Sequence, residues 1–138
     1  MAKTLNVEDV FLSKNPELSG DKPHYHIVIH KTEDNKVVVV YTTSNIERVK
    51  RKCRKLEDIK FDYIDPDGCV VINNNHCDAL DHDSAIDCNQ AQLKPITYFT
   101  EKQYFKKCQP VKDPAVIPKI KKAMKESKIV TEIIQKLL

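Results

Sequence analysis

The part of the chain with the most side chains able to do chemistry is residues 76–90, HCDALDHDSAIDCNQ. It holds two histidines, two cysteines and four aspartates. These residue types can ligate a metal, activate a nucleophile or exchange protons with a substrate. A polar loop followed by a half-buried strand could contain the same residue types without any chemical role. The rest of the chain has to separate these alternatives.

A metal site is one alternative. Zinc takes four nitrogen or sulfur ligands, which paired short spacings usually supply. The candidates here are loosely spaced: Cys69, His76, Cys77, His82 and Cys88. The five cysteines form no CxxC pair, and an odd number cannot pair completely within one chain. We therefore expect free thiols, no metal and no cofactor, and keep a small zinc domain as an alternative.

A hydrolytic enzyme is a second alternative. The chain has no GxSxG motif, and no local signature marks a cysteine nucleophile. Metal-free RNA cleavage needs a base for the 2′-hydroxyl proton, an acid for the leaving oxygen and donors for the charged phosphorane. Side chains of suitable type are present, although composition alone does not favour this chemistry: Lys22, His24, Thr42, Thr43, Ser44, Asp87 and Asn89.

The net charge is +3, and the basic and acidic residues are concentrated in different segments of the sequence. Residues 46–60 carry seven Lys or Arg against three acids, and residues 61–90 carry seven aspartates with no Lys or Arg. Residues 91–138 return to eleven lysines against four acids. Such blocks can steer a polyanion to one face. A basic helix face and an acidic loop that neutralise each other would give the same pattern.

The bulk properties are those of one globular domain spanning residues 1–138. Hydrophobic residues make up 41% of the chain and charged residues 31%, enough apolar side chains for a single core. No apolar run reaches the length of a membrane span. The opening MAKTLNVEDVFLSKN lacks the apolar centre of a signal peptide. We expect a cytoplasmic protein.

Hydrophobic periodicity predicts a β-rich α+β fold. Alternating or β-branched runs predict strands at 7–12, 24–30, 36–44, 69–72 and 84–96, with a hairpin connection at 31–35. Ser44 and Glu47 have the spacing of a capping box opening a short basic helix, and Thr100 with Gln103 is expected to cap a later segment. An apolar stripe predicts a C-terminal amphipathic helix over about 114–138, with Asp113 and Pro114 at its start and Pro118 as an awkward residue within it.

Four stretches occur in an order that resembles a known family: EDVFL, SGDKPHYHIVI, VVVVYTTS and DSAIDCNQAQLKPIT. The resemblance is to the MazF/PemK/Kid family of toxin endoribonucleases, whose members are compact SH3-like barrels related to the CcdB toxin. It implies a small SH3-like (MazF/CcdB-type) barrel with a short basic helix and a C-terminal amphipathic helix.

The same resemblance implies a function. The chain would be a cytoplasmic toxin that cleaves single-stranded RNA without metal, leaves a cyclic phosphate, forms a homodimer and is silenced by a cognate antitoxin protein. The implied catalytic residues are Lys22, His24, Thr42, Thr43 and Asp87. The implied RNA-binding residues are Ser44, Arg48, Lys50, Arg51, Ser84, Asn89 and Gln90.

The chain departs from the family at important positions. Lys22 stands where the family usually has an arginine, and a lysine lacks the bidentate fork of a guanidinium. Asp87 and Asn89 stand where some members carry an arginine and an aspartate. Asp87 is then the candidate base, with Lys22 or His24 as the acid. A barrel that binds RNA or a protein partner without cutting is the alternative.

Overall fold

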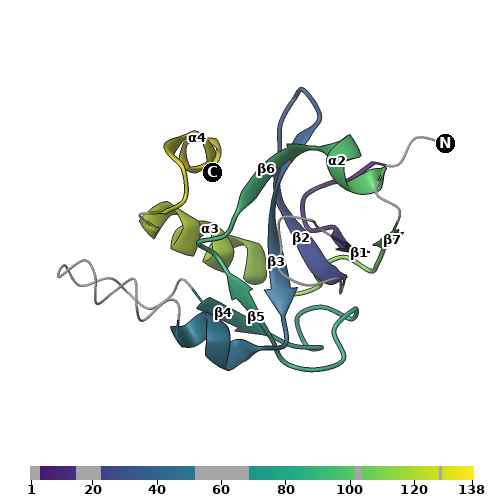
Figure 1. Cartoon of the computed structure of the whole chain (residues 1–138), viewed down its shortest axis with the longest axis vertical. Coiled ribbons are helices and arrows are strands. Elements are labelled where there is room, and N and C mark those ends of the chain that lie inside the picture. Colours follow the sequence, from purple (N-terminus) through teal and green to yellow (C-terminus); the bar gives the residue numbers. More distant parts are fainter. Residues whose placement is uncertain (1–3, 15–22, 52–68, 102–103, 128) are drawn as a thin grey trace.

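The computed structural model describes residues 4–14, 23–51, 69–101, 104–127 and 129–138 (Figure 1). Within these ranges seven strands form one antiparallel network in the order β4-β5-β3-β2-β1-β7, with β6 also paired to β3. The strands are β1 (Val10–Ser13), β2 (His24–Lys31), β3 (Lys36–Thr43), β4 (Cys69–Ile72), β5 (Ser84–Asp87), β6 (Gln92–Pro95) and β7 (Phe105–Lys107). The helices are α2 (Ile96–Thr100), α3 (Val116–Glu126) and α4 (Glu132–Leu137), and residues 46–51 are also helical. The β-rich α+β class is confirmed.

Strand β3 lies at the centre of the network. One of its edges pairs with β2, and the other edge pairs with β6 along Lys36–Val39 and with β5 at Thr42 and Thr43. Its run of four valines is fully buried, as the continuous β-branched sequence predicts. Successive valines enter two different apolar clusters, one on each face of the sheet. β3 therefore supplies core to both faces.

A tight turn joins β2 to β3, as the sequence predicts. The amide of Thr32 donates to the carbonyl of Lys36 (2.9 Å), and the amide of Asn35 donates to the carbonyl of Thr32 (3.3 Å). Asn35 has φ 62°, the left-handed conformation that closes a three-residue hairpin loop. Asparagine tolerates this conformation better than most residues.

The prediction of a single strand at 84–96 is wrong, because a turn separates β5 from β6. The Asp87 carboxylate accepts the amide of Asn89 (3.1 Å), and the Asp87 carbonyl accepts the amide of Gln90 (3.0 Å). An aspartate that binds the backbone two residues ahead makes a local turn that competes with strand pairing. β5 is also buried at every position rather than half-buried.

The first strand begins later than predicted, at Val10. Residue Glu8 has φ 79°, and its amide donates to the carbonyl of Val28 (3.0 Å). A left-handed residue interrupts extended backbone, so the ladder with β2 begins only after it. The apolar residues of this segment predict a strand throughout, but its first residues form a turn.

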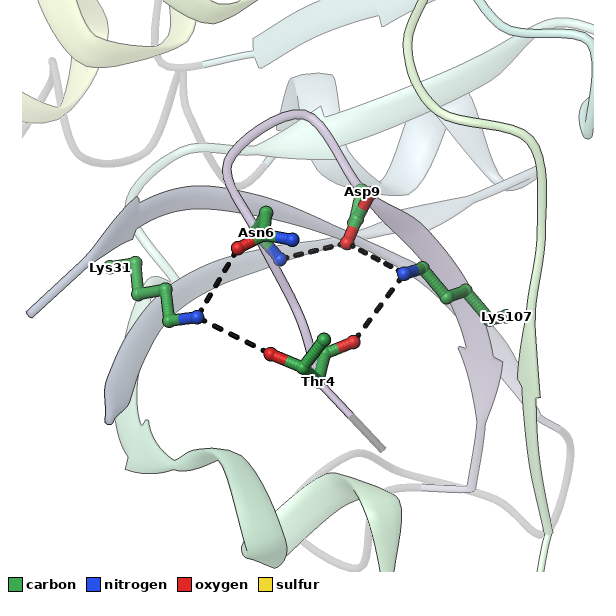
Figure 2. A network of polar contacts seen from close by, with 5 residues as sticks. All are labelled: Thr4, Asn6, Asp9, Lys31 and Lys107. Atoms are coloured by element: carbon green, nitrogen blue, oxygen red, sulfur yellow. Dashed lines mark hydrogen bonds and ion pairs between the residues drawn. The ribbon is translucent and has the colours of Figure 1, made fainter. Parts of the chain in front are cut away.

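Polar contacts tie this N-terminal turn to two strands (Figure 2). Lys31 Nζ, at the end of β2, donates to Thr4 Oγ1 (3.3 Å) and Asn6 Oδ1 (3.2 Å). Lys107 Nζ, from β7, forms an ion pair with Asp9 (3.2 Å) and donates to the Thr4 carbonyl (3.4 Å). The Asp9 carboxylate also accepts the amide of Asn6 (2.7 Å). Two lysines thereby hold the segment against the sheet.

Helix starts differ in detail from the predicted caps. Asn45, not Ser44, caps the basic helix, because its Oδ1 accepts the amide of Arg48 (3.3 Å). The predicted cap Thr100 is instead the last residue of α2, where its hydroxyl donates to the Ile96 carbonyl (3.3 Å). Its predicted partner Gln103 lies outside the described residues.

The expected continuous helix at 114–138 is two helices. Ser127 ends α3, and its hydroxyl accepts the amides of Ile129 and Val130 (both 3.2 Å). The Gln135 amide group, from α4, donates to the Ser127 carbonyl (2.6 Å). Pro118 lies in the first turn of α3, where a backbone N–H would have no helical partner, so its ring removes no hydrogen bond of the helix.

The helices cover different faces of the sheet. α3 packs on the larger cluster, which includes Ile86, Val38 and Val40. α2 packs on the smaller cluster around Phe11, Val37 and Val39. In Figure 1 α2 and β7 lie at one end of the sheet, and β4, β5 and the helical residues 46–51 lie at the other. No helix in the described ranges has the length and apolarity to cross a membrane.

One histidine, His26, belongs to the core. Its ring stacks on Phe11 with centroids 4.9 Å apart, and its Nδ1 donates to the carbonyl of His24 (2.8 Å). Burial lowers the pKa of His26 from 6.5 to about 4, because the apolar surroundings disfavour the imidazolium. His26 is therefore a neutral aromatic residue near neutral pH.

We expect this histidine to make the folded state sensitive to acid. Between pH 6.5 and 4 the unfolded chain binds a proton at His26 that the folded chain does not. The free energy of unfolding should therefore fall as the pH falls through this window, by up to about 3 kcal/mol. His26→Phe keeps the ring stack and should remove this part of the loss. Denaturant unfolding from pH 7 to 4 measures both profiles, and parallel profiles would contradict the assignment.

Candidate active site

A strip of polar side chains runs between two apolar clusters on one face of the sheet. Because strand side chains alternate, Tyr41 and Thr43 lie on the face of Val39, and Thr42 lies on the opposite face. Thr43 is paired with Ala85, which packs against Val49 of the basic helix. The strip is therefore bounded by the α2 cluster at one end and by helical residues 46–51 at the other.

His24 is the best-positioned proton-transfer group on this strip. Its Nδ1 lies 3.1 Å from the carbonyl oxygen of Thr42. A carbonyl only accepts, so the neutral ring carries its proton on Nδ1 and has its lone pair on Nε2. The carbonyl of His24 is itself held by the buried ring of His26. Two hydrogen bonds thus fix the ring with an acceptor nitrogen at its far side.

Tyr41 is a site residue that the sequence reasoning missed. Its ring packs edge-to-face on His24, with centroids 5.5 Å apart and planes at 75°. Burial and then the Asp87 carboxylate raise the pKa of Tyr41, while Arg48 acts in the opposite direction. The phenol therefore keeps its proton and can donate it in a hydrogen bond. Counting back two residues from Thr43 along the strand would have identified Tyr41 as its neighbour on the same face.

Asp87 ends β5 on the same face and is almost fully buried, with 2% of its surface exposed. It is paired with Cys69 across β4 and β5. Burial and then Asp87 raise the pKa of the Cys69 thiol, and Lys50 lowers it. Asp87 is thus close enough to act electrostatically on both Tyr41 and Cys69. Its depth fits a group that orients and polarises its neighbours.

Two cations of the basic helix act on the same neighbours as this carboxylate. Arg48 and Lys50 act electrostatically on Tyr41 and Cys69, respectively, and both side chains are exposed. Arg51 is also exposed, and its Nε donates to the Glu47 carbonyl (3.4 Å). The Thr43 hydroxyl accepts the amide of Asn45 (3.2 Å), which ends the strand and starts this helix. The structure thus brings together His24, Thr43, Asp87, Arg48 and Lys50.

Other predicted residues lie elsewhere. Thr42 is buried on the opposite face, paired with the core residue Ile86. Ser84 is also buried and donates to the His82 carbonyl (3.3 Å). The side-chain Oδ1 of Asn89 accepts a hydrogen bond from the hydroxyl of Ser127 (2.5 Å), which turns this side chain toward the C-terminal helices. Ser44 and Gln90 are exposed, and Lys22 lies outside the described residues.

The polar loop at 73–83 has a structural role. His76 Nδ1 accepts the amide of Asn73 (3.0 Å), and its Nε2 lies 4.0 Å from the Asp113 carboxylate. Lys112 Nζ binds the Asp78 carboxylate (2.5 Å), and Cys77 forms a β-bridge with Val111. These contacts fasten the loop to the segment before α3. Within the described ranges no three His, Cys, Asp or Glu side chains gather to hold a metal ion.

The described cysteines are free thiols, as expected. Burial is the largest cause that raises the pKa of Cys69, Cys77 and Cys108. A raised pKa keeps a thiol protonated, and the thiolate is the nucleophile. These three cysteines are therefore poor candidates for covalent catalysis.

Comparison with known proteins adds no relative. No protein-family model matches the chain, and no curated protein matches it. The chemistry of the site therefore has to be inferred from its residues and their geometry.

We expect the neutral form of His24 to be the Nδ1–H tautomer. The Thr42 carbonyl accepts only from a protonated Nδ1, so Nε2 should be unprotonated. Nitrogen-15 chemical shifts of the imidazole, assigned with a His24→Gln variant, distinguish the two ring nitrogens. A protonated Nε2 in the neutral ring would contradict the proposed geometry.

Proposed function

We propose that the chain is a metal-independent endoribonuclease that cleaves single-stranded RNA through attack by the 2′-hydroxyl. The observation that carries the proposal is the fixed His24 ring beside Tyr41, with its Nε2 free to accept a proton. Arg48 and Lys50 of the neighbouring helix supply positive charge for phosphate. The order of sequence motifs resembling the MazF/PemK/Kid family supports the same activity.

The reaction assigns a step to each group. His24 Nε2 takes the proton from the 2′-hydroxyl, and the 2′-oxygen attacks the adjacent phosphorus. The bond from phosphorus to the 5′-oxygen breaks, and that oxygen leaves as a hydroxyl with a proton from the Tyr41 phenol. His24 then returns its proton to the Tyr41 phenolate through solvent. The products are a 2′,3′-cyclic phosphate and a 5′-hydroxyl end.

This assignment changes the role expected of Asp87. A base for the 2′-hydroxyl has to reach the substrate, and a carboxylate with 2% exposure does not. Asp87 instead raises the pKa of Tyr41 and holds the turn at Asn89. We assign it as a positioning residue and His24 as the base.

The fold proposed with this function is an SH3-like barrel of the MazF/CcdB type. β5 and β6 both pair antiparallel with the same edge of β3, one after the other along its length, and the chain bends between them. A bend of this kind lets a strand take part in two parts of a curled sheet. The family resemblance further supports a cytoplasmic homodimer regulated by a cognate antitoxin protein.

One observation favours a second function, an RNA-binding or protein-binding barrel without catalysis. Thr42, Ser84 and Asn89 are engaged away from the strip. The strip then contains fewer polar groups than the sequence predicts. Binding of RNA without scission, unchanged in His24→Ala, would support this alternative.

The nuclease activity is tested with purified protein and mixed-sequence RNA in excess chelator. We expect cleavage, and we expect His24→Ala to reduce the rate by about 10²–10⁴-fold, the usual contribution of a positioned acid–base group. Tyr41→Phe should also slow cleavage, because it removes the donor and keeps the ring. His30→Ala, a histidine on the same strand outside the strip, is the matched control and should cleave normally.

Intact RNA with the wild-type protein would overturn the proposal. Cleavage that chelator abolishes would overturn the metal-independent mechanism. Equal losses in the His24 and His30 variants would show a general effect on folding and remove the role of His24.

A further inference from the structure

The outward side of α3 carries a dense row of lysines. Lys121, Lys122 and Lys125 line a hollow on the surface together with Ile117, Pro118 and Glu126. None of the three lysines forms an ion pair within the part of the chain that the structure describes. Lys121 and Lys125 are one helical turn apart, and like charges at this spacing destabilise a helix. The sequence therefore has these positive charges on α3 although their repulsion lowers the stability of the helix.

This lysine row lies on the opposite side of the sheet from His24 and Tyr41. The inner face of α3 packs on the cluster that contains Ile86, whereas the strip is on the face of Ala85. Neighbouring residues of a strand point to opposite faces. A ligand that touches both the strip and the lysine row has to pass around the edge of the sheet.

We infer that the outward face of α3 is a second contact surface for the phosphate backbone of an RNA strand. The inference rests on the proposed function for the choice of RNA as the polyanion. The hollow offers cations and the apolar side chains of Ile117 and Pro118, with Glu126 as its one acidic lining residue. Such a surface attracts a continuous row of phosphates without reading sequence.

The partner of this surface is a nucleic acid rather than an acidic protein segment. An acidic peptide that binds as an extended strand gains much of its affinity from backbone hydrogen bonds. A helix surface does not offer them, because the backbone groups of a helix are bonded to one another. The α3 hollow is instead lined by three lysines of one helix, and the backbone positions of Lys121 and Lys125 are about 6 Å apart along its axis. The strength of the contact should depend on charge and therefore on salt.

The test compares binding of two 2′-O-methyl RNA strands, a hexanucleotide and a strand of about thirty nucleotides, which report binding independently of cleavage. The variant is Lys121→Gln/Lys122→Gln/Lys125→Gln. Its matched control is Lys14→Gln/Lys36→Gln/Lys106→Gln, which removes the same charge from exposed lysines on or beside strands. For the long strand, the slope of log affinity against log salt should fall by about 2 in the α3 variant, because single strands contribute about 0.7 per phosphate contact.

We expect the hexanucleotide to bind the α3 variant as it binds the wild type, because it cannot reach both surfaces. The control variant should keep the wild-type difference between the two strands. A thermal unfolding midpoint no lower than that of the wild type would show that the α3 variant is folded.

Equal salt slopes for the α3 variant and the control would overturn the inference even if the protein cleaves RNA. Unchanged RNA binding with lost binding to polyglutamate would assign an acidic protein to this surface instead. A reduced slope confined to the α3 variant supports the inference, even if no cleavage is found and the proposed function fails.

Discussion

The alternation of side chains along β3 is the constraint on which the rest of the structure depends. β3 pairs on both edges and is buried on both faces, so each of its residues is committed to one side. Val38 and Val40 form core with α3, and Val37 and Val39 form core with α2. At the end of the strand the same alternation sends Thr42 into the core and presents Tyr41 and Thr43 with His24. Core and site are thus set by one register.

Buried groups beneath the strip support its side chains. His26 is stacked on Phe11 and donates to the backbone of His24, whose ring is then fixed by the backbone of Thr42. Such a chain of contacts holds the His24 ring in one orientation through packing and hydrogen bonds to the main chain. At the other end of the strip, the Asp87 carboxylate holds the turn at Asn89. Together with burial, it also raises the pKa of Tyr41. Of the two basic surfaces, only residues 46–51 adjoin the strip, whereas α3 lies on the other face of the sheet.

Much of the fold follows from residue patterns. The β-branched runs at 24–30, 36–44 and 69–72 correspond to strands, because burial on a pleated surface selects those side chains over several residues. The failures occur where one polar side chain or one backbone angle decides the outcome. Asp87 forms the turn that separates β5 from β6, and the positive φ of Glu8 moves the start of β1 to Val10. Ser127 separates α3 from α4. Such contacts carry no periodic signal.

The site was harder to predict for the same reason. His24, Thr43 and Asp87 were identified by type, but the face on which a residue lies depends on register, which motifs do not state. Tyr41 was overlooked because an aromatic residue after four valines is typical of core. The most direct measurement of the central claim is analysis of the RNA ends that the protein produces. The mechanism predicts 5′-hydroxyl and 2′,3′-cyclic phosphate ends, and 5′-phosphate ends would contradict it.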